Sequence, residues 1–148
     1  MRLEQKAITI LAGTNDWFTP NRKTRTMESI GNIIRLLGTA YPNIKIYWFS
    51  PTIRWIDWAN GVGDVSKFSD NYNVEGNGTL LEFSEDIIIE VKKHHIPVCD
   101  LYNTLGWTQY NFGNYFRGND GTHPRTFAGV TSLAKKMLSF ILANNTLY

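Results

Sequence analysis

The sequence predicts a single α/β domain, spanning residues 1–148, that is built on a parallel sheet. Three apolar segments, beginning near Ala7, Ile44 and Ile96, read as strands, and each is followed by a stretch whose apolar residues recur at helical spacing. This strand–helix alternation is typical of parallel strands joined by right-handed crossovers. The carboxyl ends of all three strands are therefore expected at one edge of the sheet.

The first predicted strand, Ala7 to Ala12, stops where small and polar side chains begin. Gly13, Thr14, Asn15 and Asp16 replace the apolar run at that point. In open α/β sheets, ligands bind beyond the carboxyl ends of the strands. A glycine lets the backbone approach a ligand closely, and Asn15 brings an amide donor. This turn is therefore a candidate site.

Apolar spacing and turn residues predict the remaining elements. They are a helix from a cap at Thr24 or Thr26 to about Thr39, a strand over 44–49, a helix from a capping box at Thr79–Glu82, a strand over 96–102, and a helix from Pro124 to about Leu142 whose apolar face carries Phe127, Val130, Leu133, Met137 and Ile141.

Two loops rich in aromatic residues interrupt this pattern. The first spans residues 52–78 and contains Trp55 and Trp58, and the second contains Tyr110 and Tyr115. Long loops in compact domains tend to be functional. These rings are expected either to form a substrate rim that stacks on sugars or to pack as a small core beneath the loops. The sequence leaves both arrangements open.

Composition excludes several classes of partner. Hydrophobic residues make up 43% of the chain and charged residues 19%, so a packed core is expected. The net charge is +2 without a basic block, which argues against nucleic acid as a partner. No apolar run approaches the ~20 residues of a membrane span. With the single cysteine Cys99, no disulfide can form within the chain.

Asp120 and His123 precede the last predicted helix at a spacing that suits acid–base chemistry. Histidine is the commonest general base, and a carboxylate that accepts its Nδ1–H fixes the tautomer. Asn15 offers an N–H to a developing oxyanion. An Asp-x-x-His pair also occurs as a helix cap or a surface pair, and asparagine after glycine is common in turns. The pattern alone leaves these interpretations open.

Two sequence blocks resemble those of the SGNH (GDSL-like) hydrolases. Gly13-Thr14-Asn15-Asp16 after an apolar strand is similar to the family's G-x-N-D block, and Asp120-Gly121-Thr122-His123-Pro124 is similar to its D-x-x-H-P block. The resemblance implies a three-layer α/β/α sandwich with a flavodoxin-like parallel sheet. This chain would supply the last three strand–helix units as a contiguous sheet and lack the first two.

The same resemblance implies roles for individual residues. Asn15 would donate in the oxyanion hole with Gly13 shaping its turn, His123 would act as general base, and Asp120 would orient it. Family members hydrolyse esters of lipids, thioesters and acetylated carbohydrates. The aromatic loops favour acyl or acetyl esters of carbohydrates as substrates. The resemblance implies no metal and no cofactor.

The sequence departs from the family at the nucleophile, because it contains no Gly-Asp-Ser block. Ser50 is the only serine at the end of a predicted strand, and it forms a Ser-Pro strand exit. The nucleophilic serine is therefore expected outside this chain, and the chain alone should have little esterase activity.

Residues 7–12 have the composition of an interior strand, because they carry no charge and no proline. We expect this strand to pair with a second copy of the chain or with an N-terminal portion that carries the serine. The alternative function is a non-catalytic glycan-binding or oligomerising module of a larger cell-surface or virion protein.

Overall fold

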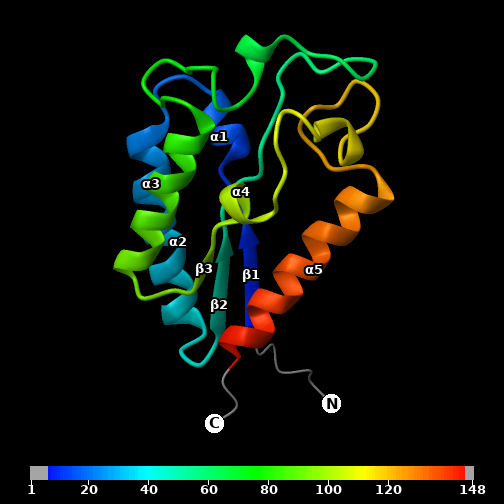
Figure 1. Ribbon diagram of the computed structural model, residues 1–148. Coiled ribbons are helices and arrows are strands. Elements are labelled where there is room, and N and C mark those ends of the chain that lie inside the picture. The colour runs from blue at the N-terminus through cyan, green and yellow to red at the C-terminus, as the bar shows by residue number, and fades with distance from the viewer. Residues whose placement is uncertain (1–6, 146–148) are drawn as a thin grey trace.

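A computed structural model of the chain describes residues 7–145 (Figure 1). Its helices and strands, in chain order, are β1 (Ala7–Leu11), α1 (Thr14–Phe18), α2 (Lys23–Ala40), β2 (Lys45–Phe49), the 3₁₀ turn η1 (Val65–Lys67), α3 (Leu80–Lys93), β3 (Val98–Cys99), α4 (Leu101–Thr104), the 3₁₀ turn η2 (Phe112–Asn114) and α5 (Phe127–Asn144).

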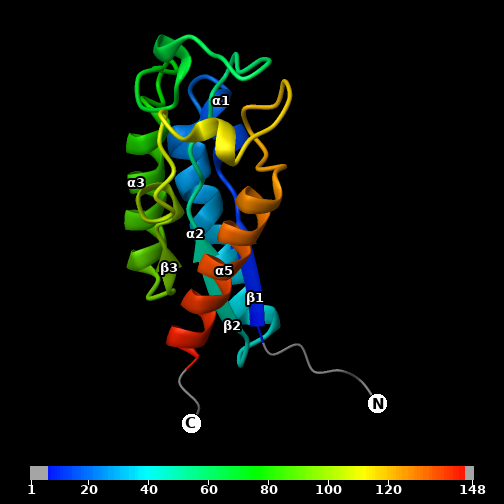
Figure 2. The ribbon, with the colours of Figure 1, turned by 45° about the vertical axis from the view of Figure 1, so that its right-hand side comes forward.

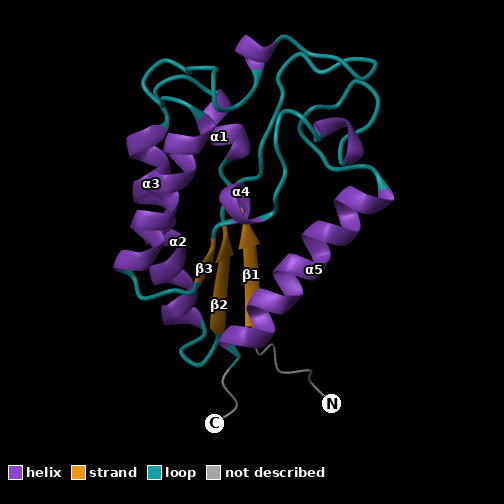
Figure 3. Cartoon of the chain, viewed as in Figure 1, coloured by secondary structure: helices purple, strands orange, loops and turns teal. Residues whose placement is uncertain are grey.

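The three strands form one parallel sheet in the order β1-β2-β3. Thr9 lies opposite Tyr47 and Leu11 opposite Phe49, while Trp48 pairs with Val98. This arrangement confirms the predicted α/β fold with a parallel sheet and contiguous strands. The carboxyl ends of the strands all point toward the long loops (Figure 3).

Helices cover both faces of the sheet, with α2 and α3 on one side and α5 on the other (Figures 1 and 2). Side chains of β2 alternate between the two layers, as the pleat of a strand requires. Trp48 packs in the core that includes residues of α2 and α3, whereas Tyr47 and Phe49 pack against α5. The layers are therefore α/β/α around three strands.

The start of α2 differs from the prediction. The helix begins at Lys23, so neither Thr24 nor Thr26 is its cap. The side chain of Asn77 performs that function: its Oδ1 accepts hydrogen bonds from the backbone N–H groups of Arg22 and Lys23, each at 2.9 Å. Its Nδ2 donates to the carbonyl oxygens of Trp17 and Thr19 at 2.7 Å. Because the capping residue lies more than 50 residues away from the helix in sequence, the residues around the helix start do not indicate it.

The third strand is much shorter than the predicted span of 96–102. Only Val98–Cys99 pairs with β2, and the chain turns into α4 at Leu101. The hydroxyl oxygen of Ser50 accepts hydrogen bonds from the N–H groups of Leu101 at 2.9 Å and Tyr102 at 3.3 Å. These two N–H groups are therefore bonded as the first donors of a helix and not as part of a strand ladder.

Helix α5 buries only part of its predicted apolar face. Leu133, Met137 and Ile141 pack against the core beneath the sheet. Phe127, in contrast, is 89% exposed, and Val130 is also exposed. The helix begins after a cap at Thr126, whose hydroxyl oxygen accepts a hydrogen bond from the N–H of Gly129 at 2.9 Å.

Strand β1 lies at one edge of the described sheet, where residues 7–145 supply it with β2 as its one neighbour. Ala7, Thr9 and Leu11 lie on the same face of the sheet as α5, but they remain exposed. No helix within residues 7–145 is both long enough and apolar enough to cross a membrane.

Asn77 provides a test of this fold. Replacing it with alanine leaves the carbonyl groups of Trp17 and Thr19 and the N–H groups of Arg22 and Lys23 without this partner. We expect Asn77→Ala to lower the free energy of unfolding by about 2–4 kcal/mol, measured by urea denaturation. Asn71→Ala is the matched control, because Asn71 is exposed and its amide makes one bond, to Val65. Equal losses in both variants would contradict this role.

Candidate functional site

Gly13 determines how the chain leaves β1 and enters α1. Its φ of 119° lies in the region that favours glycine, and a Cβ there would collide with Cδ1 of Ile87 on α3. The carbonyl oxygen of Gly13 accepts the N–H of Trp17 at 2.9 Å, and Trp17 is fully buried. This fixed turn leaves Asn15 exposed on α1, just beyond the carboxyl end of the strand.

Asp120 organises the loop that carries His123. Its Oδ1 accepts the backbone N–H groups of Thr122 at 2.9 Å and His123 at 3.0 Å. Its Oδ2 lies 3.0 Å from Nδ1 of His123 and 3.0 Å from Nε of Arg125. The carboxylate therefore holds both the backbone and the ring of His123. An imidazole held at Nδ1 in this way presents Nε2 as a proton acceptor.

These contacts change the acidity of Asp120. Partial burial by itself raises the pKa of its carboxyl. The hydrogen bonds from Thr122 and His123, together with the charge of the histidine, outweigh burial, and the pKa of Asp120 is lowered from its ordinary value. Asp120 is therefore ionised at neutral pH.

Gly121 joins this loop to the segment that follows β2. The N–H of Trp55 donates to the carbonyl oxygen of Gly121 at 2.9 Å. A Cβ on Gly121 would collide with the carbonyl oxygen of Trp55, so glycine is needed for this close approach. The aromatic core that buries Trp55 consequently fixes the position of the Asp120–His123 loop.

A cleft of about 370 Å³ brings the two predicted halves of the site together. Its walls include Gly13 and Asn15 from the end of β1, His123 from the loop before α5, and Thr52 between them. The His123 side chain is 70% exposed, whereas Asp120 lies behind it with a side chain only 20% exposed. Residues more than 100 positions apart in sequence thus share one cleft.

Ser50 does not face this cleft. It is completely buried, and its hydroxyl donates to the carbonyl oxygen of Pro51 at 3.2 Å while accepting the two N–H groups at the start of α4. This geometry gives Ser50 a structural role at the exit from β2. The structure therefore agrees with the reading of Ser50-Pro51 as the point where the chain leaves a strand.

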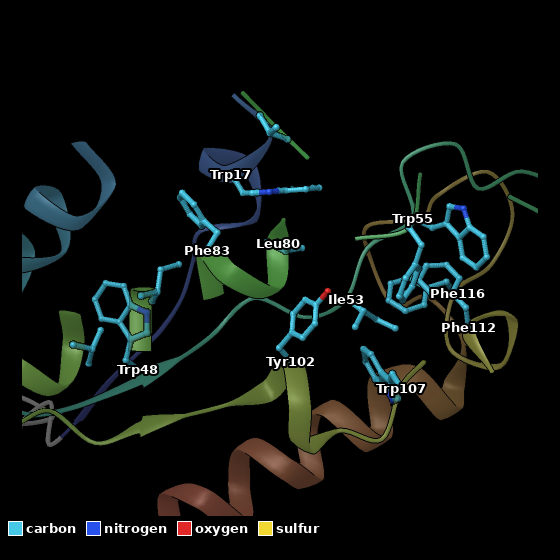
Figure 4. Close-up of a cluster of buried hydrophobic side chains, with 14 of the residues drawn as sticks. Trp17, Trp48, Ile53, Trp55, Leu80, Phe83, Tyr102, Trp107, Phe112 and Phe116 are labelled. Carbon is cyan, nitrogen blue, oxygen red and sulfur yellow. The ribbon is translucent and has the colours of Figure 1, made fainter. Parts of the chain in front are cut away.

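The four aromatic residues expected at a substrate rim occupy different environments. Trp55 and Trp58 are buried and pack against Phe112, with ring centroids 5.5 and 4.8 Å away. Of the two arrangements that the sequence left open, these two rings therefore adopt the packed core and not the sugar-stacking rim, and Figure 4 shows Trp55 next to Phe112. Tyr115 stacks on the ring of Trp107 at 4.9 Å. Tyr110 alone among the four is almost fully exposed, at 90%.

Sequence reasoning missed Arg54 and Thr52. Both lie on the segment directly after β2, and their position just past a strand end is the feature of the sequence that could have identified them.

Within residues 7–145, no three His, Cys, Asp or Glu side chains are grouped so that they could hold a metal ion.

A comparison with models of protein families shows to which family this chain belongs. Residues 1–126 match the GDSL-like lipase/acylhydrolase family. The chain belongs to this family. The family match includes Asn15, Asp120 and His123, the three residues that the resemblance had singled out. No curated relative matches the sequence significantly.

Solved structures with the same fold include proteins from several bacteria. A protein from Lactobacillus plantarum has 18% identity and a TM-score of 0.71, with 94% of this chain and 67% of that chain covered. A GDSL-like lipase from Bacteroides thetaiotaomicron has 20% identity and a TM-score of 0.62, covering 91% and 61%. A member of the lipolytic protein G-D-S-L family from Veillonella parvula has 20% identity and a TM-score of 0.56, covering 96% and 64%. This GDSL-like chain thus spans roughly two thirds of their length.

The lowered pKa of Asp120 predicts how stability depends on pH. Its contribution is fully present above the ordinary carboxyl value of 3.8 and is lost as the pH falls through the lower folded-state pKa. We therefore expect Asp120→Asn to destabilise the protein near neutral pH and to approach wild-type stability in strong acid. The measurement is the free energy of unfolding in urea between about pH 6 and 2.

Asp16→Asn is the control, because Asp16 is an exposed carboxylate that makes no ion pair within the described residues. The change in pH dependence should be larger for Asp120→Asn than for Asp16→Asn, because Asp120 alone of the two accepts the hydrogen bonds of the histidine loop. A constant difference between wild type and Asp120→Asn across the whole pH range would contradict the linkage.

Proposed function

We propose that this chain supplies the general base, its orienting acid and an oxyanion donor to a serine ester hydrolase. The observation that carries the proposal is the pairing of Asp120 Oδ2 with His123 Nδ1 at 3.0 Å, with the histidine in the same cleft as Asn15. Membership of the GDSL-like lipase/acylhydrolase family supports it.

Each residue has a defined part in the proposed reaction. Nε2 of His123 takes the proton of a serine hydroxyl as that oxygen attacks the ester carbonyl, and later returns it to the leaving alcohol. Ionised Asp120 stabilises the imidazolium. The Asn15 amide donates to the oxyanion, and Gly13 maintains the turn that holds it. This chemistry needs no metal and no cofactor.

Acyl or acetyl esters of carbohydrates are the proposed substrates. The cleft is open and carries polar groups from Asn15, Thr52 and His123, which suit a hydroxyl-rich substrate. Exposed Tyr110 borders a second cavity of about 380 Å³, whose lining also includes Asp70, Asn103 and Trp107. Aromatic side chains with a few polar groups beside them are the usual lining of a small-molecule site.

That second cavity also favours a second candidate function, glycan binding without catalysis. The ring of Tyr110 is exposed and makes no part of the hydrophobic core. In the wall of the same cavity, the side-chain oxygen of Gln109 is buried and has no hydrogen-bond partner within the described residues. Glycan binding that is lost in Tyr110→Ala, together with no His123-dependent hydrolysis in any assembly, would favour this function.

The nucleophile is proposed to come from outside this chain. We expect the purified chain to show little or no turnover of para-nitrophenyl acetate, and a fluorophosphonate probe, which labels activated serines, to leave it unmodified. Ser50→Ala should not change either result, because the Ser50 hydroxyl is committed to the start of α4. His123→Ala is the comparison that reports on the base.

Two outcomes would contradict this assignment. Robust hydrolysis that Ser50→Ala abolishes would make Ser50 the nucleophile. Robust hydrolysis that is indifferent to Ser50 but lost in His123→Ala would point to water or a partner-supplied group as the nucleophile.

The open edge of β1 is where the external strand is proposed to pair. Its N–H and C=O groups on that side have no partner within the described residues, and Leu11 is 45% exposed beside it. Helix α5 adds exposed Val130, Leu138 and Leu142. An uncharged edge next to apolar side chains is a template for strand addition. In a solution of the purified chain, a strand from a second copy would pair with this edge of β1.

We therefore expect the purified chain to self-associate, measured by sedimentation across a dilution series. Thr9→Lys places a charge on the open edge and should weaken association. Thr39→Lys is the matched control, because Thr39 is exposed on α2, which covers the other face of the sheet. A folded monomer at all concentrations, with rapid amide exchange along residues 7–11, would reject the proposal.

A further inference from the structure

The second cavity, of about 380 Å³, is built by segments that lie far apart in the sequence. Its walls come from the segment after β2, from the turn after η1, and from α4 with the loop that follows it. Figure 4 shows three side chains of its lining, Ile53, Tyr102 and Trp107. Thr52, the residue before Ile53, lines the cleft that holds His123, so one segment contributes to both spaces.

Asp70 brings a negative charge to this cavity, and the protein supplies no cation to it. Among the described residues, the lining contains no lysine, arginine or histidine, and exposed Asp70 makes no ion pair. Two cations nearby along the loop lie over aromatic rings instead. Nζ of Lys67 is 4.8 Å from the centre of the Tyr72 ring, and the guanidinium carbon of Arg54 is 4.5 Å from the centre of the Phe18 ring.

Tyr102 fixes the orientation of this carboxylate. Its hydroxyl donates a hydrogen bond to Oδ1 of Asp70, and Oγ of the buried Ser69 lies 2.7 Å from the tyrosine oxygen. Burial, and after it the hydrogen bond to Asp70, raises the pKa of Tyr102 far above its ordinary value, so the hydroxyl remains a donor at neutral pH.

Only one oxygen of the Asp70 carboxylate is engaged in this way. Oδ2 accepts no hydrogen bond within residues 7–145, whereas an ionised carboxylate offers about four acceptor sites. The carboxylate is therefore held at Oδ1 by the protein and is free at Oδ2 to accept from a ligand.

The remaining lining suits a ligand that combines a positive charge with hydroxyl groups. The ring of Tyr110 borders the cavity and is 90% exposed, and the face of an aromatic ring attracts cations. Asn71 and Asn103 also line the cavity, and the side-chain oxygens of both accept no hydrogen bond within the described residues. Such oxygens are suitable acceptors for sugar hydroxyls.

We propose that the second cavity binds the free ammonium group of an amino sugar, with Oδ2 of Asp70 accepting its N–H groups and the ring of Tyr110 lying against the sugar. The inference rests on the proposed function, because it adds to the proposed carbohydrate substrate a sugar unit that carries a primary amine. An N-acetylated sugar has no positive charge at this position, so it cannot form the charge-assisted hydrogen bond to Asp70.

The test compares three sugars that differ at one carbon. Glucosamine, N-acetylglucosamine and glucose carry an ammonium, an acetamide and a hydroxyl group there. Each is titrated into the ¹⁵N-labelled purified chain at about pH 6, where an amine of this kind is protonated, with sodium chloride added to equal ionic strength. Binding is followed by the assigned backbone amide signals of Asp70, Thr108 and Tyr110. We expect glucosamine to bind about 5-fold more tightly than the other two, or better.

A matched pair of variants assigns this preference to one carboxylate. Asp70→Asn keeps an oxygen for the Tyr102 hydroxyl but removes the charge, and it should weaken glucosamine binding about 5- to 10-fold, as for one charge-assisted hydrogen bond at an exposed position. Asp57→Asn removes the same charge from an exposed position in the same loop, outside the lining of the cavity, and should retain binding.

Two further variants separate the sugar contact from the catalytic machinery. Tyr110→Ala should weaken the binding of all three sugars, because the ring contact does not depend on the amine. His123→Ala should leave glucosamine binding unchanged, because His123 lines the other cleft. Glucosamine binding in a chain that supports no hydrolysis in any assembly would contradict the proposed catalysis and still support this amine site.

The comparison of the three sugars on the wild type needs no variant, and it decides the case in which Asp70→Asn does not fold. The proposal is overturned if glucose or N-acetylglucosamine binds as tightly as glucosamine, or if glucosamine does not move the signals of the cavity wall. It is also overturned if Asp70→Asn retains wild-type binding or if Asp57→Asn loses binding equally.

Discussion

The contact between Gly121 and Trp55 is the constraint on which the candidate site depends. One backbone hydrogen bond of 2.9 Å joins the histidine loop to the segment after β2, at a spacing too close for any side chain on residue 121. Trp55 is anchored in turn by a hydrogen bond from its indole N–H to the carbonyl oxygen of Asp64 at 2.8 Å and by packing against Phe68 and Phe112. The packed aromatic cluster, in which Figure 4 shows Trp55 beside Phe112, therefore holds the histidine loop in place through this hydrogen bond.

Two charged side chains near the cleft, Asp120 and Arg54, differ in how fully their polar atoms are hydrogen-bonded. Asp120 has every oxygen engaged and a lowered pKa, so it is a settled anion that holds His123. Arg54 has buried donors without partners, although it lies close enough to feel that carboxylate. Asp120 is therefore stabilised by its neighbours as an anion, whereas the charge of Arg54 is met within the described residues by the ring face of Phe18 and by the field of Asp120.

The sequence by itself determined that three strands form a parallel sheet and where the two motifs that meet in the cleft lie, although it overestimated the length of β3. Apolar runs such as 44–49 can be buried only inside a covered sheet, and polar residues directly after them mark its carboxyl edge. The capping box at Thr79 and Glu82 was also readable, because both of its hydrogen bonds are local, and the structure contains it. Asn15, Asp120 and His123 were readable as candidates because they stand past a strand end or before a helix, but their roles came from the family resemblance and not from the local pattern.

Tertiary structure alone decided which side chains satisfy backbone groups far away in the chain. Asn77 caps α2 across more than 50 residues, and Ser50 ends β3 by binding the N–H groups of α4. Burial of Trp55 and Trp58, and the unpaired state of Arg54, likewise depend on neighbours brought together only by the fold. Local pattern cannot predict these features, because a polar or aromatic side chain carries no record of the distant atoms that it contacts.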